Sequence, residues 1–104
     1  MTFGDFKRTT SESKPPATLS APLRALWHDA KGEWDAAHEV AQSIDDPTGA
    51  WIHAYLHRKE GDLGNAGYWY RRAQKPDCRS SLDAEWEQIA TAVLDAADQA
   101  AKTE

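Results

Sequence analysis

Residues 52–76 read IHAYLHRKEGDLGNAGYWYRRAQKP, and the residues 29 positions earlier, 23–47, read LRALWHDAKGEWDAAHEVAQSIDDP. The two stretches align without a gap. Identical residues stand at five equivalent positions: Ala25 and Ala54, His28 and His57, Gly32 and Gly61, Ala37 and Ala66, and Pro47 and Pro76. Self-similarity at a fixed period is typical of proteins built from stacked helix pairs. The alignment therefore predicts two copies of one supersecondary unit.

Apolar residues recur at helical spacing from Leu19 onward, and no segment shows the strict alternation of a half-buried strand. Gly32 and Gly61 stand where a left-handed residue ends a helix, and Pro76 cannot continue one. Helices are expected over residues 20–32, 33–43, 46–61, 63–75 and 81–100. The sequence thus predicts an all-α fold, an alpha-alpha superhelix of two stacked helical hairpins with a C-terminal capping helix.

The 104 residues allow one small domain. Residues 1–18 are rich in Thr, Ser, Lys and Pro, with Phe3 and Phe6 as their only large apolar side chains, which favours a flexible N-terminal arm. Residues 19–104 are predicted to form a single helical domain. In its last helix an apolar stripe is expected to cover an exposed end of the stack: Leu82, Trp86, Ile89, Val93 and Ala97.

The second copy follows the order small residue, glycine, acidic residue, large apolar residue, alanine, aromatic residue, alanine and proline. These positions are Ala54, Gly61, Asp62, Leu63, Ala66, Tyr70, Ala73 and Pro76. The order resembles the tetratricopeptide repeat, and AGYWYRRA, residues 66–73, is similar to the related Sel1-like repeat. The resemblance covers about half the chain. It implies a helical interaction domain in which the first helix of each pair lines a concave surface.

Charge and composition exclude several classes of protein. The formal net charge of −5 disfavours nucleic-acid binding, because affinity for phosphate backbones needs a basic surface. The single Cys78 can form no intramolecular disulfide and no thiolate cluster. No apolar run is long enough for a signal peptide or a membrane span. We therefore expect a cytoplasmic protein without nucleic-acid or membrane partners.

The segment 52–79 is basic, with a net charge of +3, and it lies between acidic segments. Aromatic and cationic side chains at i, i+4, i+7 and i+8 of the helix 46–61 suit a peptide that carries carboxylates. The predicted partner-binding residues are Trp51, Tyr55, Arg58, Lys59, Tyr68 and Arg72. The alternative is that the two rings of this helix fill the seam between helices while its cations are solvated.

The leading interpretation is a non-enzymatic protein or peptide interaction module without a cofactor, and an acidic partner suits its cations. The first alternative is a homodimer formed through exposed ends of the stack. The second is a metal-binding protein that uses His53 and His57, which lie four residues apart on one side of a helix. No catalytic residues are predicted, because no nucleophile has a base near it in sequence and GDLGNAG, residues 61–67, lacks the lysine of a phosphate-binding loop.

Overall fold

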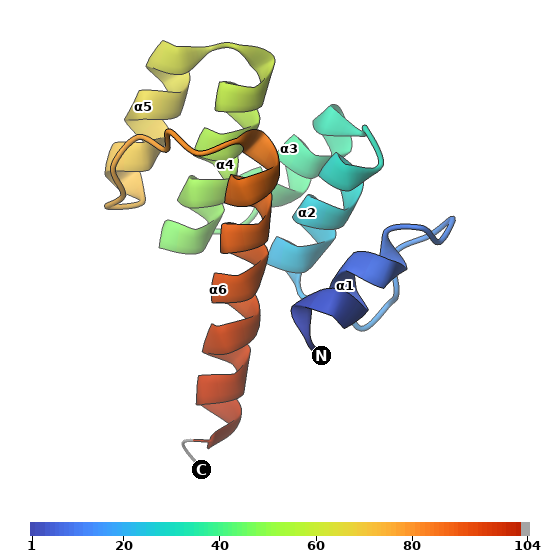
Figure 1. Cartoon of the computed structure of the whole chain (residues 1–104). Coiled ribbons are helices and arrows are strands. Elements are labelled where there is room, and N and C mark those ends of the chain that lie inside the picture. The colour runs from blue at the N-terminus through green and yellow to red at the C-terminus, as the bar shows by residue number, and fades with distance from the viewer. Residues whose placement is uncertain (103–104) are drawn as a thin grey trace.

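The described part of the chain, residues 1–102 of a computed structural model, folds into helices and contains no strand (Figure 1). Side chains are described for residues 1–100. The helices are α1 (Phe3–Thr9), α2 (Ala21–Ala30), α3 (Trp34–Gln42), α4 (Pro47–Glu60), α5 (Leu63–Arg72) and α6 (Leu82–Lys102). The prediction of an all-helical fold is confirmed, and the five expected helices correspond to α2–α6. The predicted domain 19–104 includes residues 103–104, which lie outside the described part.

Two helical hairpins, α2–α3 and α4–α5, close through the same type of turn. Gly32 has φ +77° and Gly61 has φ +90°, a region that favours glycine because it has no Cβ. After each glycine the next amide donates back to a histidine carbonyl: Glu33 N to His28 O and Asp62 N to His57 O, both at 2.9 Å. The equivalence of the two turns agrees with the 29-residue repeat.

Small residues are buried where these helices meet. Ala25, Ala37, Ala54 and Ala66 are each at most 3% exposed, so the helix axes can approach closely. Helix α3 contacts α4 directly and so joins the first hairpin to the second. Larger side chains complete the core, among them Leu23, Leu26, Trp27, Ile52, Leu56 and Ile89.

Helix α6 lies against α2 and α4, one helix from each hairpin, and continues beyond them toward its C-terminus (Figure 1). The indole of Trp86 donates to the carbonyl of Leu26 at 3.0 Å, and Ile89 is fully buried. Ala97, expected on the buried stripe, is exposed. The sequence predicts that this helix covers an end of the stack, whereas the structure places it across both hairpins. None of the described helices is long and apolar enough to span a membrane.

The N-terminal segment differs from the predicted flexible arm. Residues 3–9 form α1, which begins with a capping box between Thr2 and Asp5. Phe6 is fully buried and stacks on Trp86, with ring centroids 5.4 Å apart. The Trp27 indole donates to the carbonyl of Thr9 at 2.8 Å. These contacts correct the prediction for residues 3–9: the apolar area that orders the segment comes from α6, far away in the sequence.

Candidate metal centre and adjoining pocket

Three imidazoles meet at the contact between the two hairpins. His38 comes from α3, and His53 and His57 come from successive turns of α4. One ring nitrogen of each histidine lies within 4.8 Å of a ring nitrogen of the other two. His38 Nε2 and His53 Nε2 are 2.9 Å apart. The cluster therefore collects nitrogen ligands from both repeats.

The local sequence brings α3 and α4 close enough for this contact. Ala37 and Ala41, which are buried, leave room for α4 beside the turn of α3 that carries His38. Gly49 lets the loop between α3 and α4 pack against the start of α4, since a Cβ there would clash with the backbone oxygen and the side chain of Ile44. The close approach of the two helices places His38 opposite His53.

Two indoles hold the imidazole rings in place. Trp69 stacks on His53 with centroids 3.8 Å apart and planes at 10°. Trp34 stacks on His38 at 4.9 Å and 13°, and its own Nε1 donates to the carbonyl of Leu56 at 2.8 Å. Packing of this kind preorganises a site, because the rings lose little further freedom when a ligand binds.

Burial keeps the central imidazole neutral. His53 is 5% exposed, and burial together with the neighbouring His38 and His57 lowers its pKa to about 4. The pKa of His38 is also lowered, mainly by burial and then by His57. Neutral imidazole is the form whose ring nitrogen can bind a metal ion.

His57 differs from the other two because a carboxylate binds its ring. Its Nδ1 lies 2.8 Å from Oε1 of Glu60, one turn further along α4. When Nδ1 carries the proton, it donates to Glu60 and leaves Nε2 as the nitrogen with a free lone pair. Glu60 and Asp62 also have ligand atoms within 4.8 Å of His57.

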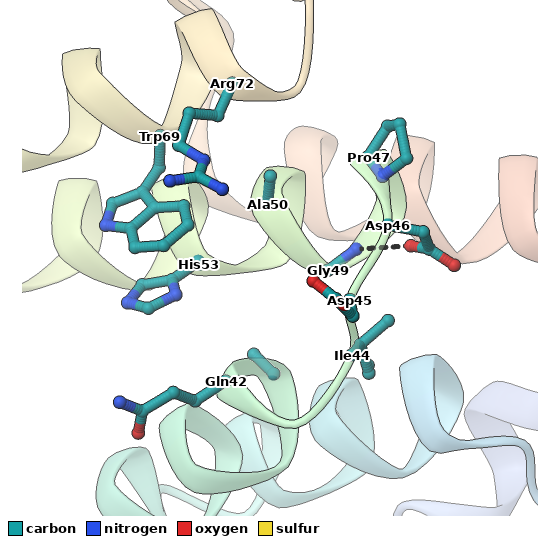
Figure 2. A pocket seen from close by; sticks show the side chains of 11 residues that line it. Gln42, Ile44, Asp45, Asp46, Pro47, Gly49, Ala50, His53, Trp69 and Arg72 are labelled. Carbon is teal, nitrogen blue, oxygen red and sulfur yellow. Dashed lines mark hydrogen bonds between the residues drawn. The ribbon is translucent and has the colours of Figure 1, made fainter.

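A pocket of about 280 Å³ adjoins the cluster on the side of His53 (Figure 2). Trp69 lies between His53 and the guanidinium of Arg72, and these three side chains form one side of the pocket (Figure 2). The guanidinium carbon is 5.1 Å from the Trp69 ring, and Nη1 donates to the hydroxyl of Tyr68 at 3.0 Å. Asp45 and Asp46, in the loop before α4, lie on the opposite side (Figure 2).

The six predicted partner-binding residues fall into three pairs in the structure. Trp51 and Arg58 bind the carboxylate of Glu85 on α6, through Nε1 at 3.1 Å and Nη1 at 2.8 Å. Tyr55 and Lys59 bind the buried Asp29 of α2, at 2.8 and 2.9 Å. The third pair, Tyr68 and Arg72, is exposed on α5, and Arg72 lines the pocket.

Glu85 is a fully buried carboxylate, yet it is well satisfied. Besides Trp51 and Arg58, the hydroxyl of Tyr70 donates to it at 2.7 Å. Burial and this carboxylate raise the pKa of Tyr70 far above its ordinary value, so the hydroxyl stays protonated as a donor. In effect, an acidic residue of the chain itself occupies part of the predicted peptide surface.

Sequence reasoning identified His53 and His57 but not the third imidazole or the pocket. His38 lies 15 residues before His53, and the stacking of the hairpins alone brings it near. The repeat held a usable signal, because the second helix of one stacked pair faces the first helix of the next pair. A third histidine could therefore have been sought in residues 34–42, on the side of the helix near Ala37 and Ala41, where His38 lies.

No protein-family model, curated protein or solved structure matches this chain. The resemblance to tetratricopeptide and Sel1-like repeats therefore remains a prediction. The chemistry of the site is inferred from its own side chains and distances.

Proposed function

We propose that this protein binds a divalent transition-metal ion, zinc being the best fit, through His38, His53 and His57. The convergence of three imidazoles from two hairpins carries this proposal. Imidazole nitrogen suits zinc, copper and nickel, and zinc sites with three protein ligands keep a fourth position for water or another ligand.

The spacing of His38 and His53 is close to that of two ligands on a tetrahedral ion, and a ring nitrogen of His57 lies within 4.8 Å of both. Zinc–nitrogen bonds of about 2.0–2.1 Å place neighbouring ligand atoms roughly 3.3 Å apart. His38 Nε2 and His53 Nε2, at 2.9 Å, would need to separate by only a few tenths of an ångström. In their present hydrogen bond one Nε2 donates and the other accepts, so a metal ion would take the lone pair of the acceptor directly and that of the donor after its proton moves to Nδ1.

Glu60 supports the proposal as the partner of a ligand. Metal-binding histidines almost always donate their second ring N–H to a carboxylate, a carbonyl or water, which fixes the tautomer and raises the basicity of the ring. The contact between His57 Nδ1 and Glu60 has this form.

An ion at this position would bridge the two hairpins, so we infer a structural role in fixing how the repeats stack. We further propose that α2–α3 and α4–α5 are short tetratricopeptide-like units of a superhelix, closed on one side by α6. The matching turns at Gly32 and Gly61 support this arrangement.

Binding of an acidic peptide along α4, the function predicted from the sequence, has less support. Glu85 occupies Trp51 and Arg58, and Asp29 occupies Tyr55 and Lys59. An acidic peptide would have to displace α6 or compete with buried carboxylates. For a protein partner, the exposed pair Tyr68 and Arg72 on α5 remains accessible.

The test is a calorimetric zinc titration of protein that carries no polyhistidine tag and has been dialysed against a chelator. We expect one ion per chain, and at least tenfold weaker binding in His38→Gln and His53→Gln, since each removes one of three ligands. His28→Gln is the matched control: His28 is the repeat equivalent of His57 and also contacts a glutamate, but it lies outside the cluster.

The control variant should bind zinc within twofold of the wild type. A stoichiometry well below one ion per chain would end the proposal. Equal losses in His28→Gln and His53→Gln would also end it, because they would show binding by scattered surface histidines.

A further inference from the structure

The pocket beside His53 has opposite charges on its two sides that do not neutralise each other. Arg72 lies on one side, and Asp45 and Asp46 lie on the other (Figure 2). Among the described side chains, no ion pair joins Arg72 to either aspartate. A cavity therefore lies between a cation and two anions that form no ion pair with it.

The groups that line the pocket retain capacity to bind a ligand. A guanidinium has five N–H donors, and Arg72 uses one of them on the Tyr68 hydroxyl. Asp46 accepts from the amide of Gly49 through Oδ1 as the N-cap of α4, and its carboxylate points away from Arg72 and Trp69 (Figure 2). Asp45 is exposed at the pocket and forms no hydrogen bond or ion pair with the described residues.

The remaining surface is aromatic and apolar. Trp69 is fixed between His53 and Arg72, and Ala41, Ile44 and Ala50 contribute aliphatic area. At about 280 Å³ the pocket is close to the lower end of the range for small-molecule sites, so its ligand must be small.

We propose that this pocket binds a small molecule that carries both a carboxylate and an ammonium group, as a free amino acid does. Arg72 takes the carboxylate, a geometry for which the planar guanidinium is suited. Asp45 takes the ammonium group, and the chain between the two charges lies along Trp69. A ligand with one charge alone would satisfy one side and leave the other without a partner.

The experiment is an NMR titration with a series of ω-amino acids, which varies the separation of the two charges: glycine, β-alanine, γ-aminobutyrate, 5-aminovalerate and 6-aminohexanoate. Butyrate and butylamine serve as single-charge probes of similar size. The indole N–H signal of Trp69 reports on the pocket itself. All samples contain a chelator, so the result does not depend on the proposed metal site.

We expect at least one ω-amino acid to bind with a Kd of about 1 mM or tighter, and at least tenfold more tightly than butyrate or butylamine. Arg72→Gln should weaken binding at least tenfold, because it removes a charged hydrogen-bond donor. Arg71→Gln is the matched control: Arg71 is the neighbouring exposed arginine of α5 and does not line the pocket, so binding should stay within twofold.

The acidic side is tested with Asp45→Asn, which leaves Asp46 as the N-cap of α4. It should bind the best ω-amino acid at least tenfold more weakly and leave butyrate unaffected. The proposal is overturned if no probe shifts the Trp69 signal at 20 mM, or if the Arg71 and Arg72 variants bind alike. Because a chelator is present throughout, this failure and a failure of zinc binding are separate results.

Discussion

Two of the contacts that polar side chains of helix α4 make with neighbouring helices, one with α6 and one with α3, are satisfied in different ways. Toward α6, Trp51 and Arg58 donate to the carboxylate of Glu85, so the buried charge is compensated by protein donors. Toward α3, His53 meets His38, another neutral imidazole, at 2.9 Å. The first contact joins a charge to its counter-charge, while the second is a hydrogen bond between two uncharged rings.

The contrast between the contacts of Glu85 and of His53 indicates which of them has room for a ligand. A buried carboxylate with three side-chain donors is complete without a ligand, and its role is to hold α6 in place. The cluster of His38, His53 and His57 instead brings three imidazoles together, and imidazole nitrogens can bind a cation. We therefore assign a structural role to the Glu85 cluster, which is Glu85 with its donors Trp51, Arg58 and Tyr70. We assign a binding role to the histidine cluster of His38, His53 and His57.

The largest effect is expected from Glu85→Ala. It leaves the partly buried Arg58 without its counter-charge and removes the acceptor of Tyr70, which should cost about 3 kcal/mol of unfolding free energy. This loss of unfolding free energy can be measured by urea denaturation, with far-ultraviolet circular dichroism as the signal. Glu87→Ala, on the exposed side of the same helix, should change stability by no more than about 0.5 kcal/mol. Equal costs in the two variants would refute a structural role for the Glu85 cluster.

A smaller effect is expected from pH. The pKa of His53 is about 4 in the folded protein and 6.5 in the unfolded chain, so the unfolded chain binds more protons between these values. The contribution of His53 to stability is therefore complete above pH 6.5 and is lost as the pH falls toward 4. Between pH 7 and pH 4.5, wild type should lose on the order of 2 kcal/mol more than His53→Gln.

Chelator in both samples excludes metal from this comparison. Parallel losses in the wild type and the variant would show that His53 titrates normally in the folded protein. That result would remove the neutral character on which the contrast with Glu85 depends.

The smallest effect is expected from Glu60→Gln. The amide still accepts a hydrogen bond from His57 but no longer raises the basicity of the ring, so zinc affinity should fall by about tenfold. Because Glu60 is exposed, the stability of the metal-free protein should change by less than about 0.5 kcal/mol. An unchanged zinc affinity would mean that the contact between Glu60 and His57 has no part in metal binding.

The parts of the fold that were predicted well are those that depend on local signals in the sequence. Gly32 and Gly61 mark turns because a positive φ is a local requirement, and the 29-residue repeat reports both hairpins at once. The spacing of His53 and His57 on one helix face follows from helix geometry alone. None of these features needs information from a distant part of the chain.

The parts that were not predicted depend on long-range contacts. Phe6 is ordered by Trp86, and Arg58 is neutralised by Glu85, a partner that no pattern within α4 reveals. His38 becomes a candidate ligand only when the hairpins stack. The composition of residues 1–18 is indeed poor in apolar groups. It could not show that Phe3 and Phe6 would both pack against the ring of Trp86 on α6.

The stacking of Phe6 on Trp86 has a consequence for the order of events during biosynthesis. A ribosome makes α1 before α6 and reaches residue 86 only after the residues of both hairpins. Until then Phe6 lacks the Trp86 ring on which it stacks. The carboxylate of Glu85, which accepts from Trp51, Arg58 and Tyr70, is also absent. The contact of Thr9 with Trp27 can form as soon as α2 has been made, whereas the stacking of Phe6 on Trp86 can form only after α6 has been synthesised.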